Sequence, residues 1–471
     1  MYLYDKLNLY SKEDYYPFHM PGHKRNIELM GSFNPYEIDI TEIDGFDNLH
    51  DAQDIIKQSM DRAARLYHSQ NTFYLVNGST SGILTGISAC TKKGDKILMA
   101  RNCHKAAYHA VFLNELNPVY LYPQYDDKKG IQCGYSAKYI ENMLIKHPDV
   151  SLIVLVSPTY EGVVSEIKEI CELAHKRNIP VLVDEAHGAH FTFHEAFPAS
   201  ALDLGADVVI QSVHKTLPAF TQTALLHVNS SLVDLDKIKT YSSIYQTSSP
   251  SYVLMAGIDR CVSILEEQGE RLFAELIQNL EVFYEEMKAL KHLLVIDHEG
   301  RDMSKIIIST RQTNMTGTEL YDILVTNYRL PMEMAEADYI LAMATVGDTA
   351  EGFERLKTAL KEIDATLSQE ASTKKPSYAP VEAEVVLLQH EAFLCQKKTC
   401  LLENSENEIA GSFVNLYPPG IPILAPGERI THNTIEHIKS YMEAGLSIKG
   451  LVDEKYVLIV NREDETCQKY L

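Results

Sequence analysis

Gln211-Ser212-Val213-His214-Lys215-Thr216 follows the apolar run Asp207–Ile210 and places a lysine just beyond it. A second apolar run, Pro180-Val181-Leu182-Val183-Asp184, ends in an aspartate 31 residues before that lysine. Short runs that are apolar on both faces are typical of buried parallel strands. Asp184 and Lys215 are therefore expected at or just past the carboxyl ends of two strands.

Apolar runs alternate with helix-like stretches over much of the chain. The helix candidates include Ser136–Lys146 and Glu166–Arg177. Repeated alternation of strand and helix predicts an α/β domain with a mostly parallel sheet covered on both faces. Ligands of such sheets bind beyond the carboxyl ends of the strands. The runs are Thr72–Val76, Lys96–Ala100, Pro118–Tyr122, Ser151–Ser157, Pro180–Asp184, Asp207–Ser212 and Thr223–Val228.

A lysine and an aspartate at strand ends suit pyridoxal 5'-phosphate. The lysine can form a Schiff base with the cofactor, and the carboxylate can hold its pyridine nitrogen protonated. A lysine after a strand is more often only a solvated charge, so other groups must support the interpretation. Asn77–Gly82 follows a strand and opens an apolar helix, where backbone N–H groups and hydroxyls can bind phosphate, although it could equally be an ordinary turn and cap. His104, after another strand, could stack on an aromatic cofactor.

Two other interpretations of the same region are weaker. Asp184-Glu185-Ala186-His187 spells a helicase box, but the chain contains no Walker A loop. The formal net charge of −22 also argues against a nucleic-acid partner. His187, His190 and His194 could suggest a metal cluster, but their spacing matches no zinc motif, so we expect no metal site.

The length and composition predict a soluble protein of several domains. The chain has 471 residues, of which 45% are hydrophobic and 23% charged. Its eight cysteines are scattered without a Cys-x-x-Cys pair, which is typical of reduced thiols. The chain begins without an apolar signal core and has no apolar run of transmembrane length, so we expect a cytoplasmic protein with no membrane partner.

Five segments are expected along the chain. They are an N-terminal arm (1–35), a cofactor-binding large domain (36–265), a small α+β domain (266–368), a polar linker (369–380) and a C-terminal α/β domain (381–471). The small domain is expected from a long periodic stretch at Tyr252–Leu290, then a strand at Ser304–Ser309, a helix at Gly317–Tyr328, a β segment at Tyr339–Val346 and a helix at Ala350–Ile363.

Several segments in order resemble the Orn/Lys/Arg decarboxylase family, fold-type I pyridoxal-phosphate enzymes with the aspartate-aminotransferase-like fold. The length is similar to that of the short Gram-positive arginine/lysine decarboxylases, which lack the N-terminal wing domain of longer relatives. The matching segments are Met20–Lys24, Asp39–His50, Val76–Gly82, Arg101–Lys105, Ser157–Gly162, Asp184–His190, Ser212–Thr216, Ser248–Tyr252 and Tyr417–Glu428.

The resemblance implies a role for individual residues. Lys215 would carry the cofactor, Asp184 would pair with the pyridine nitrogen, and His104 would stack on the ring. Catalytic roles fall to these three and to His214. The full set expected around the cofactor is Ser79, Thr80, Ser81, His104, Asp184, Ala186, His187, Ser212, His214 and Lys215. The carboxylates expected to recognise a cationic substrate are Asp39, Glu42, Asp44, Asp47 and Glu428.

The activity that the resemblance implies is α-decarboxylation of a basic L-amino acid, within polyamine biosynthesis. Arginine is the first choice of substrate, lysine the second and ornithine the third. The active unit would be at least a homodimer with shared sites, in which Gln246–Pro250 reaches the neighbouring copy. An aminotransferase, a β-eliminating lyase and a catalytically inactive relative that binds the cofactor remain alternatives.

Overall fold

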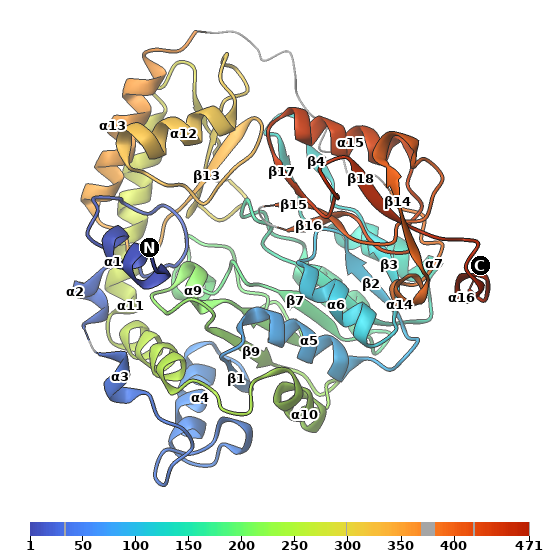
Figure 1. Ribbon diagram of the computed structural model, residues 1–471. Coiled ribbons are helices and arrows are strands. Elements are labelled where there is room, and N and C mark those ends of the chain that lie inside the picture. Colours follow the sequence, from blue (N-terminus) through green and yellow to red (C-terminus); the bar gives the residue numbers. More distant parts are fainter. Residues whose placement is uncertain (33, 298, 369–381, 418–419, 471) are drawn as a thin grey trace.

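The computed structural model describes residues 1–32, 34–297, 299–368, 382–417 and 420–470 (Figure 1). The expected linker at 369–380 lies outside the described residues. None of the described helices combines the length and the hydropathy that a bilayer-spanning segment needs.

Seven strands form the central sheet, in the order β1-β9-β8-β7-β6-β2-β3 (Figure 1). The strands from β8 to β3 in this order are parallel to one another, and β9 runs antiparallel to β8 and β1. Strands β7, β8 and β9 are buried along their whole length, which explains their mostly apolar sequence. The mostly parallel sheet confirms the predicted fold class. The strands are β1 (Asn71–Leu75), β2 (Lys96–Ala100), β3 (Asn117–Leu121), β6 (Val150–Val156), β7 (Val181–Asp184), β8 (Val208–Gln211) and β9 (Ala224–Val228).

Helix α5 (Gly78–Cys90) packs closely on this sheet. A Cβ atom at Gly82 would lie 2.6 Å from Leu75 Cδ1, and one at Gly86 would lie 2.5 Å from Leu182 Cδ1. A larger residue at either position would force these leucine side chains to shift, so the two glycines favour the close approach of α5 to the sheet. The other helices and short strands of this domain are α4 (Ile55–Leu66), α6 (Lys105–Leu113), α7 (Ala137–Lys146), α8 (Ile167–His175), α9 (Val213–Thr216), α10 (Leu235–Tyr245), β4 (Tyr125–Asp126) and β5 (Ile131–Gln132).

Helix α11 (Tyr252–Met287) leads from the large domain into a smaller unit (Figure 1). The expected boundary between residues 265 and 266 falls inside this helix, and one hydrophobic core continues across it, so the division stays a prediction. The smaller unit has an antiparallel sheet in the order β10-β11-β13-β12. Its elements are β10 (Leu294–Val295), β11 (Lys305–Ser309), α12 (Gly317–Tyr328), β12 (Met334–Ala335), β13 (Tyr339–Met343) and α13 (Ala350–Asp364).

The N-terminal arm packs against this smaller unit. Phe18 is fully buried; its N–H donates to Pro331 O (2.9 Å) and its carbonyl accepts from Met343 N (2.9 Å). Lys24 is also buried, and its Nζ donates to the carbonyl oxygens of His19 (3.0 Å) and Met343 (2.8 Å). These contacts with the smaller unit hold the N-terminal arm in place, although its polar and aromatic sequence shows neither helical nor strand periodicity. Its helices are α1 (Leu3–Tyr10), α2 (Ile27–Met30) and α3 (Pro35–Ile38).

The C-terminal region has its own hydrophobic clusters and two small sheets, β14-β18 and β16-β15-β17. It lies against the β2–β3 side of the central sheet (Figure 1), where helix α14 contacts α6. Its elements are α14 (Gln389–Leu394), β14 (Lys397–Leu401), β15 (Val414–Tyr417), β16 (Ile421–Leu424), α15 (His432–Glu443), β17 (Ser447–Lys449), β18 (Tyr456–Val460) and α16 (Glu465–Gln468).

Candidate active site

A cavity of about 750 Å³ opens at the carboxyl ends of the parallel strands. Val156 and Asp184 end β6 and β7, Lys215 follows β8 in α9, and His104 follows β2. The small unit and the C-terminal region complete the wall, so all three parts of the chain meet there. This is where ligands bind in parallel α/β sheets.

Lys215 Nζ lies 3.0 Å from His187 Nε2 at one end of the cavity. Burial lowers the pKa of Lys215, and the nearby charge of Asp184 opposes that shift. Burial also holds the pKa of His187 well below its usual range, as does the charge of Lys215, so the imidazole is neutral. A lysine with a lowered pKa is more often the neutral amine, which is the nucleophilic form.

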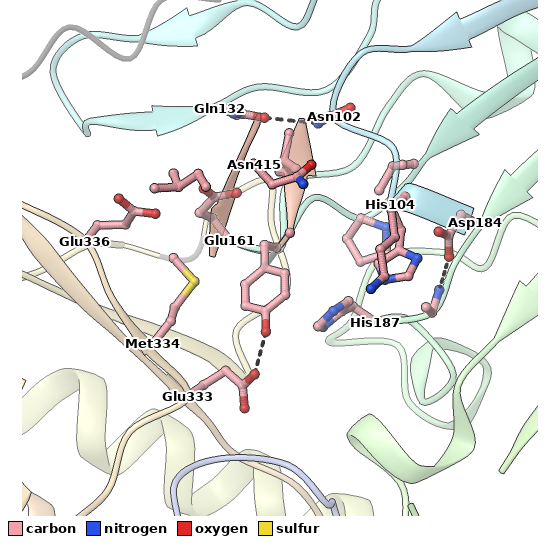
Figure 2. A pocket seen from close by; sticks show the side chains of 18 of the residues that line it. Asn102, His104, Gln132, Glu161, Asp184, His187, Glu333, Met334, Glu336 and Asn415 are labelled. Carbon is pink, nitrogen blue, oxygen red and sulfur yellow. Dashed lines mark hydrogen bonds between the residues drawn. The ribbon is translucent and has the colours of Figure 1, made fainter. Parts of the chain in front are cut away.

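Asp184 is 7% exposed, and its Oδ1 accepts the N–H of Ala186 at 3.1 Å (Figure 2). Burial raises the pKa of this carboxyl group, and Lys215 opposes the shift. A cationic N–H donor facing the buried carboxylate would form a charge-assisted hydrogen bond. A protonated pyridine nitrogen is such a donor, so the carboxylate fits the predicted cofactor.

His104 caps helix α6 and accepts the N–H of Ala106 through Nδ1 at 3.2 Å. Burial lowers its pKa to about 4, with a further contribution from the charge of Lys215, so its imidazole is neutral near pH 7. Figure 2 shows His104, Asp184 and His187 grouped at the same end of the cavity. A fixed, neutral aromatic ring at this place suits stacking against a planar cofactor.

A pair of hydroxyl groups joins the predicted phosphate-binding loop to the segment that precedes Lys215. Ser79 Oγ, in the first turn of α5, lies 2.5 Å from Ser212 Oγ, which precedes α9. Hydroxyls beside the N-terminus of a thirteen-residue helix suit a phosphate group. Ser81 instead donates to Gly78 O (2.9 Å), and the Thr80 side chain is exposed.

His214 is fixed by a hydrogen bond from its ring to the backbone. Its Nδ1 donates to Thr223 O at 2.8 Å, which leaves Nε2 as the acceptor of the neutral ring. Burial lowers its pKa to about 4. The His214 carbonyl also accepts the N–H of Gly22 at 2.7 Å, so the N-terminal arm helps to hold this segment.

Tyr160 and Glu333 are site residues to which the sequence analysis assigned no role. The Tyr160 ring lies 4.5 Å from the His187 ring, and its hydroxyl donates to Glu333 Oε1. Glu333 Oε2 accepts the N–H of Met20 at 2.9 Å. Tyr160 lies within the segment Ser157–Gly162 that carries the family resemblance, which was the available signal.

A buried triad of Lys305, Asp302 and His190 supports the loop that carries His187. Lys305 Nζ lies 3.2 Å from Asp302 Oδ2, and Asp302 is also paired with His190 Nε2 at 3.2 Å. Lys305 Nζ donates to the carbonyl oxygen of His187 at 3.4 Å. The signal in the sequence was a lysine that opens the otherwise apolar strand β11.

The expected substrate carboxylates do not line this cavity within one copy of the chain. Asp39 and Asp44 are exposed, and Glu42 is half-buried. Asp47 caps helix α4: its carboxylate accepts backbone N–H groups, Asp54 N at 2.9 Å among them, and these bonds outweigh burial and lower its pKa.

Glu428 lies in the joint between the large domain and the C-terminal region. It is 1% exposed, and both of its carboxylate oxygens accept from the Arg101 guanidinium. Glu428 Oε2 also accepts the N–H of Ala425 at 2.9 Å. The structure thus gives Glu428 a structural contact and does not bring it to the cavity.

Comparisons with known proteins agree with this geometry. Residues 2–325 match the model of the Orn/Lys/Arg decarboxylase major domain, and residues 365–454 match that of its C-terminal domain. An arginine decarboxylase of Bacillus subtilis is 32% identical over 99% of both chains. That of Bacillus anthracis is 32% identical over 96% of this chain and 95% of its own. The Francisella novicida lysine decarboxylase has a similar fold, with a TM-score of 0.78 and 18% identity over 94% of this chain and 81% of its own.

Proposed function

Because the chain belongs to the Orn/Lys/Arg decarboxylase family, we propose that this pyridoxal-phosphate-dependent decarboxylase removes the α-carboxylate of a basic L-amino acid. Arginine is the first choice, because the Bacillus relatives are arginine decarboxylases; lysine is the second and ornithine the third. The observation that carries the proposal is the meeting of Lys215, His187, Asp184 and His104 at one end of a single cavity.

We assign the cofactor contacts to the residues that the site brings together. Lys215 Nζ would hold it covalently, Asp184 would pair with its pyridine nitrogen, and His104 and Ala186 would cover its two faces. The hydroxyls of Ser79 and Ser212, helped by the first turn of α5, would hold its phosphate. Thr80, Ser81, His187 and His214 keep their predicted cofactor contacts as part of this proposal.

Bound pyridoxal phosphate supplies an electron sink for the pair released as CO₂ leaves. The carboxylate of Asp184 would keep that sink charged, because a buried anion favours a proton on a nitrogen placed beside it. Neutral His187, whose Nε2 lies 3.0 Å from Lys215 Nζ, orients the amine. We assign the return of a proton to Cα to Lys215 Nζ, with His214 as the alternative donor.

The test is a panel of L-amino acids assayed for CO₂ release, with identification of the product. Arginine, lysine and ornithine are each compared with an uncharged analogue of similar length, such as citrulline or norleucine. We expect CO₂ and the corresponding amine from a basic amino acid. A keto acid as the main product would replace the proposal by an aminotransferase, and no product from any basic amino acid would refute it.

We further propose that the active unit is a homodimer with shared sites. Thr247, Ser248 and Ser249 are exposed in the single chain, whereas Gln246 is buried and accepts the N–H of Val76 at 2.8 Å. Large apolar side chains of the first 46 residues are also exposed, among them Tyr36 and Phe46. Light scattering at assay concentration tests this proposal, and a fully active monomer would contradict it.

Two broader expectations remain part of the proposal. The amine product would enter polyamine biosynthesis, and the enzyme would act in the cytoplasm. Family membership supports both. Loss of the cellular amine pool on deletion of the gene, restored by the wild-type chain, would test the first; fractionation of cells would test the second.

A further inference from the structure

Two buried glutamates face the cavity away from Lys215. Glu161 follows strand β6 and is 8% exposed, and Glu336 follows β12 and is 7% exposed. Both line the cavity. Figure 2 shows them on one side of it, with His104 and Asp184 on the other. The cavity therefore has an acidic end and an end that carries the reactive lysine.

Neither glutamate is neutralised by a cation of the described chain. No ion pair to Glu161 or Glu336 occurs there, and Glu336 Oε2 is buried without any hydrogen-bond partner among the described residues. Glu161 Oε1 accepts a hydrogen bond from a neutral donor, the Tyr339 hydroxyl, at 3.0 Å. The neighbouring Arg311 forms an ion pair with Asp338, in which Arg311 Nη1 lies 3.3 Å from Asp338 Oδ2.

The other cations near this end are occupied or exposed. The Arg301 guanidinium donates to backbone oxygens, including that of Lys305 and, at 2.7 Å, that of Ile296. Lys449 lines the cavity from β17, but its side chain is exposed and forms no ion pair with either glutamate. Among the described residues, Glu161 and Glu336 thus line this end of the cavity without an ion pair, although the charge of Arg301 acts on Glu161.

An arrangement of this kind is unfavourable without a ligand. Burial raises the pKa of Glu161, and burial together with the charges of Glu161 and Asp338 raises that of Glu336 well above its usual value. A buried carboxylate without a partner costs free energy that a bound cation would offset. Unpaired charges of this kind concentrate at binding sites.

We propose that Glu336 and Glu161 bind the side-chain cation of the substrate. The amino-acid end then lies at Lys215, and the cationic end lies between two carboxylates carried by different domains. The inference rests on the proposed function, since it assigns the group that recognises a basic amino acid. A guanidinium and an ammonium group can each donate to two carboxylates, but the planar guanidinium has five donors and the ammonium three.

The test compares Glu336→Gln and Glu161→Gln with the matched control Glu351→Gln, which changes an exposed glutamate of helix α13 in the small unit. For each protein, kcat/KM is measured for the basic amino acids and for citrulline and norleucine. Binding of the product amines agmatine and cadaverine is measured separately by calorimetry. Because glutamine removes an unpaired buried charge, Glu336→Gln should be at least as stable to heat as the wild type.

We expect Glu336→Gln and Glu161→Gln to lose about 100-fold in kcat/KM for the preferred basic amino acid, with little change for the uncharged analogues. Amine binding should weaken by a similar factor, and Glu351→Gln should behave as the wild type. A larger loss of affinity for agmatine would indicate that the two glutamates bind a guanidinium group, and a larger loss for cadaverine would indicate an ammonium group.

Two outcomes would overturn the inference. If the wild type decarboxylates a basic amino acid and both glutamine variants keep its selectivity and amine affinity, the inference fails while the proposed function stands. A loss of selectivity in Asp44→Asn, with both glutamates dispensable, would transfer recognition to the acidic segment 39–47 of a second copy. If the wild type releases no CO₂, the proposed function fails, and amine binding to Glu336→Gln still decides whether the two glutamates bind a cation.

Discussion

Replacing Glu428 by glutamine should weaken the joint between the large domain and the C-terminal region. Arg101, just beyond strand β2, donates to both carboxylate oxygens of Glu428, with Nη2 2.9 Å from Oε2. The same Nη2 donates to Ile423 O at 3.0 Å, and the guanidinium carbon lies 4.7 Å from the centre of the Tyr120 ring. Both partners are almost completely buried, at 5% and 1% exposure.

The burial sets the size of the expected effect. Removing one member of a buried ion pair leaves the other charge without a partner and costs about 3–5 kcal/mol. That cost favours opening of the joint by about two to four orders of magnitude. Replacing both members by methionine removes both charges, so Arg101→Met/Glu428→Met should recover most of the stability lost by either single change.

Urea unfolding followed by circular dichroism suits the measurement, because the chain has no tryptophan. Hydrogen exchange at Ala425, whose N–H donates to Glu428 Oε2, reports the local opening. The matched control is Glu384→Gln. Glu384 pairs with Arg429 at 2.8 Å, but its side chain is 61% exposed, so its loss should have little effect on the stability of the fold.

An unfolding midpoint for Glu428→Gln equal to that of the Glu384→Gln control would refute this reasoning. A loss of selectivity between lysine and norleucine without a loss of stability would do so as well. The second result would return Glu428 to the substrate-binding role that the sequence had suggested.

Three further changes test the cofactor site and its support. Lys215→Ala should lose the visible absorbance that the wild type develops with pyridoxal phosphate, because no amine remains for covalent attachment; borohydride trapping on another lysine would contradict this. Asp184→Asn should keep the cofactor but lose turnover worth roughly several kcal/mol, so a near-normal kcat would argue against its pairing with the pyridine nitrogen. Asp302→Asn should destabilise the fold by about 3–5 kcal/mol, because it leaves Lys305 buried without the carboxylate 3.2 Å away. The charges of His190 and Lys305 outweigh burial and lower the pKa of Asp302, so its contribution is fully present above the unfolded pKa of about 4 and is lost as the pH falls below it. The difference in thermal midpoint between the variant and the wild type should therefore shrink in acid, and a constant difference would rule the ion pair out as its cause.

Local patterns in the sequence predicted most elements close to their observed bounds. The helix expected at Gly317–Tyr328 is α12 with the same limits, and the run expected at Ser151–Ser157 is β6 at Val150–Val156. The long periodic stretch at Tyr252–Leu290 is α11, which ends at Met287. These predictions succeeded because a helix or strand that is buried on one face or on both has a regular pattern of apolar residues, and this pattern can be recognised within a short stretch of sequence.

The sequence also located the reactive end of the cavity. Asp184 and Ile210 are partners in the parallel pairing of β7 and β8, so groups at or beyond these strand ends lie at one edge of the sheet. Chain direction and strand order are enough to bring Asp184 and Lys215 together. The hydroxyl pair of Ser79 and Ser212 follows from the same rule, because α5 and α9 each begin at that edge.

Only the tertiary structure decided which carboxylates are free. The sequence favoured Glu428 and the acidic segment 39–47 for a cationic substrate and gave Glu161 and Glu336 no role. Folding pairs Glu428 with Arg101 and commits Asp47 to a helix cap, and it buries Glu161 and Glu336 in the cavity wall without a cation. The pairing of Glu428 depends on a contact between segments hundreds of residues apart. Local periodicity carries no information about such contacts, because they form only when the separate units pack together.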